Sequence, residues 1–132
     1  VGVVVVPKAK KSIVLVDDEP IVCETVKITL GARGYDIRTV EDPTLAIAAI
    51  REAKPDLIIL DLYMPGIDGA SLCRTLKDDA ELQGIPVLFF SGSSKPVDVM
   101  SGLKAGGYDW VGKPVDGEEL LAKVEAILGL KK

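Results

Sequence analysis

The chain has 132 residues, of which 48% are hydrophobic, and its formal net charge at pH 7 is −4. This length suits one domain with a buried core, and the composition argues against intrinsic disorder. Residues 12–130 hold all 20 acidic residues but only 11 of the 16 basic ones, so this stretch has a net charge of −9. Such an acidic body argues against nucleic acid as a direct partner, since phosphate contacts need clustered lysine and arginine.

Histidine is absent from the sequence, which excludes histidine-based catalytic triads, zinc sites and phosphohistidine carriers. Cys23 and Cys73 both fall in helical patterns, and we expect reduced, buried apolar groups rather than a redox pair. The apolar stretches are too short for a membrane span, and residues 1–6 are too short for the core of a signal sequence. We therefore expect a cytoplasmic protein with no membrane partner.

Strand and helix signals alternate through the first half of the chain. Residues 13–16 predict a strand, residues 22, 26 and 30 recur at helical spacing, and Gly34 is placed to end that helix. Residues 35–40 predict a second strand. Asp42 is a suitable N-cap, with Pro43 at the first helical position, for a helix whose apolar stripe lies at 46, 49, 50 and 53. The third strand, at 57–60, is apolar throughout, as expected of a strand covered on both faces.

The alternation continues through the second half. Pro65 and Gly66 mark a loop, and a short helix follows around residues 72–76. Residues 87–90 predict the fourth strand, 97–105 a weaker helix, and 109–111 the fifth strand. Asp116, with Glu119 three residues later, is typical of a capping box that opens a last helix, which Gly129 ends.

This order of elements predicts one α/β domain over residues 12–130, built as a doubly wound, five-stranded parallel sheet with helices on both faces. Residues 1–11 lie outside the pattern, and we expect them to be a flexible arm or a cloning remnant. In such a sheet, the residues just past the carboxyl ends of the strands meet in one crevice, where ligands bind.

Chemically active side chains follow four of the five predicted strands. Asp17 and Asp18 follow the first, Asp61 the third, Ser91 the fourth and Lys113 the fifth. The first two acids could equally serve as an N-cap for the next helix. Three acids at neighbouring strand ends would repel one another unless a cation neutralised them, and Mg²⁺ is a hard cation that takes oxygen ligands. With a hydroxyl and an ammonium beside them, the set predicts a magnesium-dependent phosphoryl-transfer site.

Four motifs carry a resemblance to a known family. They read Val16-Asp17-Asp18-Glu19-Pro20, Asp61-Leu62-Tyr63-Met64-Pro65-Gly66-Ile67-Asp68-Gly69, Phe90-Ser91-Gly92 and Trp110-Val111-Gly112-Lys113-Pro114. With these motifs, the chain resembles the receiver domains of two-component response regulators, of the CheY-like type, over about residues 12–128. The resemblance implies the flavodoxin/CheY-like (βα)5 fold.

The resemblance also implies a phosphoacceptor and a metal site. Asp61 is expected to take a phosphoryl group from a phosphohistidine on a sensor histidine kinase or a histidine phosphotransfer protein. Mg²⁺ is expected on Asp18, Asp61 and the backbone carbonyl of Tyr63, with Asp17 acting through water. Lys113 is expected to hold the phosphoryl oxygens together with the hydroxyl of the fourth strand end, Ser91.

A switch is implied as well. Ser91 and Trp110 would respond to phosphorylation and change the surface built by the fourth helix, the fifth strand and the fifth helix, where a downstream target or output domain docks. A homodimer is left open. The peptide bond between Lys113 and Pro114 is expected to be cis. The domain would be a signalling switch rather than an enzyme, catalysing only its own phosphotransfer and dephosphorylation.

Several residues depart from the usual family pattern. Trp110 is bulkier than the usual tyrosine or phenylalanine, and a plain core tryptophan is the other interpretation. Tyr63 stands where smaller or polar residues are common, and we hypothesise that its ring shields the phosphoryl group and slows hydrolysis. Gly106, Gly107 and Gly112 make the approach to the fifth strand rich in glycine, which puts the stiffness of the switch in question.

Three other functions fit the pattern less well. A magnesium-dependent aspartyl phosphatase resembling the haloacid dehalogenase family needs a second acid two residues after the nucleophile, where Tyr63 stands. A flavodoxin-like cofactor binder needs a loop rich in glycine and hydroxyls after the first strand, where acids at 17–19 would repel a phosphate. A non-switching receiver, kept for docking or dimerisation, usually lacks an acid or the lysine, and here none is missing.

Overall fold

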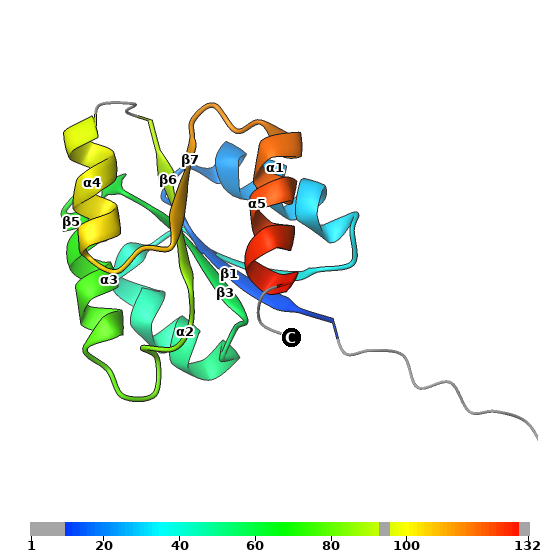
Figure 1. Cartoon of the computed structure of the whole chain (residues 1–132). Coiled ribbons are helices and arrows are strands. Elements are labelled where there is room, and N and C mark those ends of the chain that lie inside the picture. The colour runs from blue at the N-terminus through cyan, green and yellow to red at the C-terminus, as the bar shows by residue number, and fades with distance from the viewer. Residues whose placement is uncertain (1–9, 93–95, 130–132) are drawn as a thin grey trace, which may run out of the picture.

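A computed structural model describes residues 10–92 and 96–129, so most of the arm expected at residues 1–11 lies outside the described part. Strands and helices alternate along the chain (Figure 1). The strands of the main sheet are β1 (Ser12–Val16), β2 (Asp36–Val40), β3 (Leu57–Asp61), β6 (Val87–Ser91) and β7 (Asp109–Gly112). The helices are α1 (Pro20–Gly31), α2 (Ala46–Ala53), α3 (Gly69–Lys77), α4 (Pro96–Lys104) and α5 (Gly117–Gly129).

The main sheet is parallel, with the strand order β2-β1-β3-β6-β7. The chain runs from β1 out to β2 and then back past β1 to β3, so the direction of winding reverses between β1 and β3. Helices α1 and α5 cover one face of the sheet, and α2, α3 and α4 cover the other (Figure 1). The predicted doubly wound fold is therefore confirmed, and β1 and β3 flank the switch point where such folds bind ligands.

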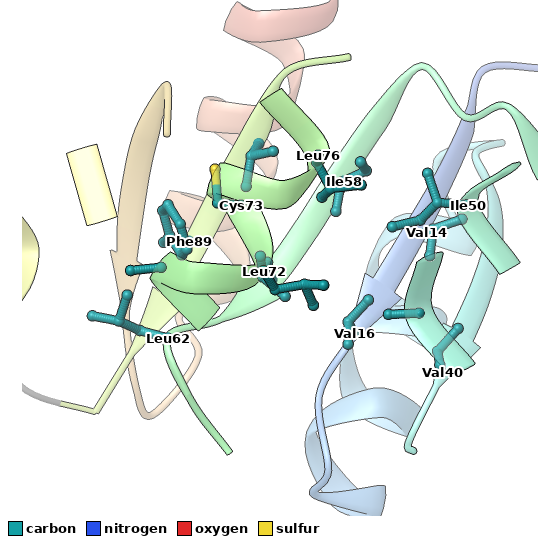
Figure 2. Close-up of a cluster of buried hydrophobic side chains, with 14 of the residues drawn as sticks. Val14, Val16, Val40, Ile50, Ile58, Leu62, Leu72, Cys73, Leu76 and Phe89 are labelled. Atoms are coloured by element: carbon teal, nitrogen blue, oxygen red, sulfur yellow. The ribbon is translucent and has the colours of Figure 1, made fainter. Parts of the chain in front are cut away.

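Alternate residues of the inner strands face two separate cores. On β1, Val14 and Val16 belong to the core under α2 and α3, whereas Ile13 and Leu15 belong to the core under α1 and α5. Figure 2 shows the first core, where side chains of α2 and α3 pack against β1, β3 and β6. All five residues of β3 are buried, which explains why the four residues before Asp61 are apolar without alternation.

The two cysteines lie in different cores. Cys23 is buried on α1 and Cys73 on α3, and both are free. The prediction that they are buried apolar groups rather than a redox pair is confirmed.

The N-cap at Asp42 is confirmed, although the helix that it opens begins as a 3-10 turn, and the helix end predicted at Gly34 was wrong. Asp42 caps a short 3-10 helix, η1 (Pro43–Leu45), because its Oδ1 accepts a hydrogen bond from the N–H of Thr44 at 3.0 Å, and α2 begins only after this turn. Helix α1 ends at Gly31 rather than at Gly34. Gly34 lies beyond the helix end with a φ of +89°, in a turn conformation that glycine adopts readily.

The last helix behaves as its capping signal predicts. Asp116 Oδ1 accepts hydrogen bonds from the N–H groups of Glu118 and Glu119 at 2.9 and 3.3 Å, and α5 ends at Gly129. Within residues 10–92 and 96–129, no helix is long and apolar enough to cross a membrane.

A two-stranded antiparallel ribbon follows β3 and was not predicted. Strand β4 (Tyr63–Met64) pairs with β5 (Ile67–Asp68) around the loop expected at Pro65 and Gly66. The φ of Gly66 is +77°, and proline followed by a glycine of positive φ is typical of a type II turn. The ribbon is too short to show alternation in the sequence.

Gly69 lets this ribbon return to the end of β3. Its N–H donates to the carbonyl oxygen of Leu62 at 2.8 Å, and a Cβ at this position would lie 2.2 Å from the carbonyl oxygen of Asp61. A side chain cannot fit at that distance, so the close approach of the two backbone segments requires glycine.

Candidate functional site

The carboxyl ends of four neighbouring strands bring the predicted site residues together. Asp17 directly follows β1, Asp61 and Ser91 are the last residues of β3 and β6, and Lys113 directly follows β7. The first three are buried, with exposed fractions of 0, 3 and 2%. Buried charges are stable only when they are paired, so the contacts of Lys113 with the two carboxylates define the site.

Lys113 lies at the centre of the acids. Its ammonium nitrogen Nζ is 3.1 Å from Asp61 Oδ2, 2.9 Å from Asp17 Oδ2 and 2.8 Å from Glu19 Oε1. An ammonium has three N–H groups, so three carboxylates can share it. The backbone N–H of Lys113 also donates to the carbonyl oxygen of Ser91 at 2.8 Å, which ties the end of β7 to β6.

The acids exceed the single ammonium in charge. Asp17, Asp18, Glu19 and Asp61 each offer a carboxylate oxygen, and these atoms lie within 4.8 Å of one another. Asp17 Oδ2 is buried, and among the described residues it has only the ion pair with Lys113 and no hydrogen bond of good geometry. An all-oxygen donor set with excess negative charge and an under-satisfied buried oxygen fits a hard divalent cation.

Burial and repulsion act on Asp61. Burial raises the pKa of its carboxyl to about 6, the negative charge of Asp17 adds to this rise, and the hydrogen bond from Lys113 opposes it. At Lys113 the balance is reversed: burial alone would lower the pKa, but the carboxylates of Glu19, Asp17 and Asp61 hold it above its usual range. Lys113 therefore stays a cation, whereas the pKa of Asp61 is raised towards neutral pH.

The thiol of Cys23 borders the site from α1. Its Sγ donates to the backbone carbonyl oxygen of Asp17 at 3.2 Å. Burial first, and the charge of Asp17 second, raise the pKa of this thiol to about 11. Cys23 is therefore a neutral, inert group that supports the loop after β1.

Tyr63 lies beside the Asp61 carboxylate. Its backbone N–H donates to Asp61 Oδ1 at 3.3 Å, while its side chain is 53% exposed on β4. The backbone of Tyr63 thus contacts Asp61, while its side chain is largely exposed to solvent. The peptide bond between Lys113 and Pro114 is cis.

Trp110 is half-buried on β7 and packs against the edge of the core under α2 and α3. The ammonium of Lys123, on α5, lies 5.5 Å from the centre of its ring and also donates to the carbonyl oxygen of Trp110. Lys123 forms ion pairs with Asp109 at 3.4 Å and Glu119 at 3.7 Å. Trp110 is thus neither a fully buried core residue nor a free surface one.

Two contacts escaped the sequence analysis. Glu19 stands in the first motif without a predicted role, although it is the last of three consecutive acids that follow the first predicted strand. Lys123 lies in α5 and reaches Trp110 across 13 residues, and the sequence carries no signal for that contact.

Comparison with known proteins agrees with this geometry. Residues 13–125 match the family described as the response regulator receiver domain. The DNA-binding response regulator MtrA of Mycolicibacterium smegmatis is 39% identical over 119 residues, which cover 90% of this chain and 51% of MtrA. The transcriptional regulatory protein CseB of Streptomyces avermitilis is 34% identical over 116 residues, covering 88% of this chain and 48% of CseB. The chain thus spans about half the length of the curated relatives it matches.

Solved structures show the same fold. The chemotaxis response regulator CheY4 of Vibrio cholerae superposes with a TM-score of 0.84 at 26% identity, covering 90% of this chain and 99% of that one. The receiver domain of a signal transduction histidine kinase from Syntrophus aciditrophicus superposes with a TM-score of 0.82 at 35% identity, covering 90% of both chains. With sequence, fold and site in agreement, this chain belongs to the response regulator receiver domains of two-component signalling systems.

Proposed function

We propose that Asp61 is the residue of this receiver domain that accepts a phosphoryl group, and that it takes it from the phosphohistidine of a kinase or phosphotransfer protein. One observation carries the proposal. The buried Asp61 carboxylate lies at the end of the central strand β3, 3.1 Å from the Lys113 ammonium and within 4.8 Å of three other acids. This arrangement pairs a nucleophile with the charges that phosphoryl transfer needs.

The chain's own part in the reaction is mostly to position groups. An Asp61 carboxylate oxygen attacks phosphorus, the donor's N–P bond breaks, and its electron pair stays on the imidazole nitrogen. A pKa of about 6 leaves Asp61 mostly ionised at pH 7, so the nucleophile is ready. Lys113, already beside Asp61, would hold a phosphoryl oxygen, and Ser91 offers a hydroxyl from the end of β6.

We propose that Mg²⁺ is the cation that this acid cluster binds. Asp18, Asp61 and the backbone carbonyl of Tyr63 would hold it, with Asp17 contributing through water. When bound, it neutralises charge on the carboxylates and on the phosphoryl oxygens. The negative charges of Asp17 and Asp61, which among the described residues only Lys113 balances, would then be balanced by the cation as well.

We further propose that phosphorylation shifts the balance between two states of the surface made by α4, β7 and α5. The new phosphoryl oxygens would draw on Ser91 and Lys113, and Trp110 on β7 would change its packing. A downstream target or output domain would read that surface. This is the work of a signalling domain, which catalyses only its own phosphorylation and dephosphorylation.

Partners and location follow from the same proposal. MtrA is described as DNA-binding, whereas the acidic body of this chain offers no clustered lysine or arginine for DNA, so we assign nucleic-acid contact no part in the function of residues 12–129. The free thiols of Cys23 and Cys73 suit a reducing compartment, and the cytoplasm is the location we propose.

Incubation with acetyl phosphate and Mg²⁺, followed by intact-mass measurement, tests the proposal. We expect the wild-type chain to gain a single phosphoryl group, and Asp61→Asn or excess chelator to abolish the gain. Asp78→Asn is a matched control, because it removes an exposed carboxylate at the far end of α3 and should behave as wild type. A wild-type chain that stays unmodified, or an Asp61→Asn chain that is modified equally, contradicts the proposal.

Two alternatives predict different results. A phosphatase of the haloacid dehalogenase type would turn over phosphate monoesters, but Tyr63 occupies the position of the required second acid. A non-switching receiver would show no change at Trp110, whether or not it takes up the phosphoryl group. Because the acids and Lys113 are all present and in contact, we favour the switch.

A further inference from the structure

Glu19 makes a contact that its place in the chain does not explain. It is the N-cap residue of α1, where a side-chain oxygen usually accepts a hydrogen bond from the first turn. Among the described residues, its carboxylate makes no such capping bond. Instead, Glu19 Oε1 lies 2.8 Å from Nζ of Lys113, 94 residues away in the sequence.

The backbone of Glu19 is anchored within the acid cluster. Its N–H donates to Asp17 Oδ1 at 2.9 Å, and its φ of −92° and ψ of 110° are extended. The chain bends at Asp18, between the two acids, and both carboxylates reach the Lys113 ammonium, at 2.9 and 2.8 Å. Asp17 and Glu19 therefore approach the Lys113 ammonium from the same loop.

The three carboxylates that contact Lys113 have different proposed roles in the reaction. Asp61 is the acceptor, and Asp17 takes part in the cation site. Glu19 is 58% exposed at its side chain, whereas those of Asp17 and Asp61 are almost fully buried, and its contact with Lys113 is the shortest of the three. It is the partner that can stay in place while the other two exchange their contacts.

We propose that Glu19 is a positioning residue, which holds the Lys113 ammonium over Asp61 while the other two partners of that ammonium change during phosphorylation. The inference rests on the proposed function of Asp61. The contact is partly exposed, and ion pairs of this kind alter equilibria and rates by about two- to fivefold.

The rate of phosphorylation by acetyl phosphate in excess Mg²⁺ measures this effect. We expect Glu19→Gln to slow the reaction about two- to fivefold. Glu24→Gln is the matched control, because it removes the same charge from α1 but from a groove that also contains Thr39 and Glu41, away from Lys113. Its rate should equal that of the wild type. Equal urea midpoints for the two variants establish that both are folded.

A double-mutant cycle with Lys113→Met separates positioning from other roles. If Glu19 acts through Lys113, Glu19→Gln causes no further loss in the Lys113→Met background. A loss of the same size in both backgrounds overturns the inference. So does a Glu19→Gln rate equal to or above that of the wild type, which would make Glu19 idle or a competitor.

Magnesium titration removes the remaining alternative, since Glu19 belongs to the carboxylate cluster. A loss that persists at saturating Mg²⁺ supports positioning of Lys113, whereas a loss that vanishes there makes Glu19 a cation ligand and overturns the inference. A wild-type chain that takes no phosphate overturns the proposed function together with this inference. A phosphorylated wild type with an unaffected Glu19→Gln overturns the inference alone.

Discussion

The strands that supply Asp61 and Lys113 are held very differently. Strand β3 is central, pairs with β1 and β6, and is buried at all five positions. Strand β7 is at the edge of the sheet, pairs with β6, and is buried only at Val111 among its four residues. The proposed acceptor, Asp61, thus lies on a rigid element, and the lysine and tryptophan that would respond to it lie on a looser one.

This difference suits a domain that must hold one group still and let others move. A phosphoacceptor needs a fixed distance to its cation site and to an incoming donor. A readout needs side chains whose packing can change at modest cost in free energy, as half-buried groups on an edge strand can. Substitutions on the two strands should therefore differ in the size of their effects on stability.

The largest effect is expected at the end of β3. In Gly69→Ala, the new Cβ would lie 2.2 Å from the carbonyl oxygen of Asp61, so the backbone that carries Asp61 must shift. We expect a loss of about 3 kcal/mol in the free energy of unfolding, measured by urea denaturation. Gly84→Ala, where a Cβ meets no atom within 4 Å, is the control and should be near neutral. Equal losses in both variants would contradict the rigid-strand interpretation.

Asp61→Asn should stabilise the chain in the absence of metal. The rise of its pKa from 3.8 to about 6 means that the ionised, folded form costs about 3 kcal/mol. This shift already includes the opposing hydrogen bond and charge of Lys113. We therefore expect an increase of up to about 3 kcal/mol in the free energy of unfolding at pH 7, measured by urea denaturation with chelator.

The pH dependence of this difference has a defined sign. Because the pKa of Asp61 is raised in the folded state, the stability that its proton contributes is complete below about pH 4 and lost as the pH rises through about 6. The advantage of Asp61→Asn should therefore shrink as the pH falls from 7 to 4. Added Mg²⁺ should also shrink it, by stabilising the wild type. A difference independent of both pH and Mg²⁺ would argue against a strained acid cluster.

A smaller effect is expected on β7. Lys123→Met removes the cation from the face of Trp110 and should lower the free energy of unfolding by about 0.5–1 kcal/mol. Since the chain has one tryptophan, its fluorescence reports on this site alone, and we expect its emission to change. Lys123→Arg keeps a cation there and should retain the wild-type spectrum. Unchanged emission in Lys123→Met would mean that the contact does not persist in solution.

The smallest effect on stability, but a visible one on kinetics, is expected for Tyr63→Asn. The ring is largely exposed, so its loss should leave the urea midpoint almost unchanged. If the ring shields the phosphoryl group on Asp61 from water, the phosphorylated form should lose phosphate several-fold faster, measured by intact mass over time. Tyr108→Asn, another exposed tyrosine outside the site, is the control. Equal lifetimes in all three proteins would refute shielding.

Much of the fold and of the site was predictable from local sequence. The sheet and both helical layers were predicted from the uninterrupted apolar runs of the inner strands and from the helical spacing between them. A strand that is buried on both faces has a continuous apolar sequence, which is easy to recognise. The ribbon around Pro65 and Gly66 was missed because two-residue strands carry no periodicity. The N-cap at Asp42 was predicted, but the 3-10 geometry of the turn that follows it was not.

The amino-acid order by itself determined which strands exist, where each one ends, and which acids, hydroxyl and ammonium follow them. Only the tertiary structure decided which of these groups pair with one another. Lys113 contacts three carboxylates, and Glu19 is one of them instead of capping α1. The physical reason is distance. Periodicity acts between neighbours in the chain, whereas Coulomb interactions act between groups that folding brings within a few ångströms, however far apart they lie in sequence.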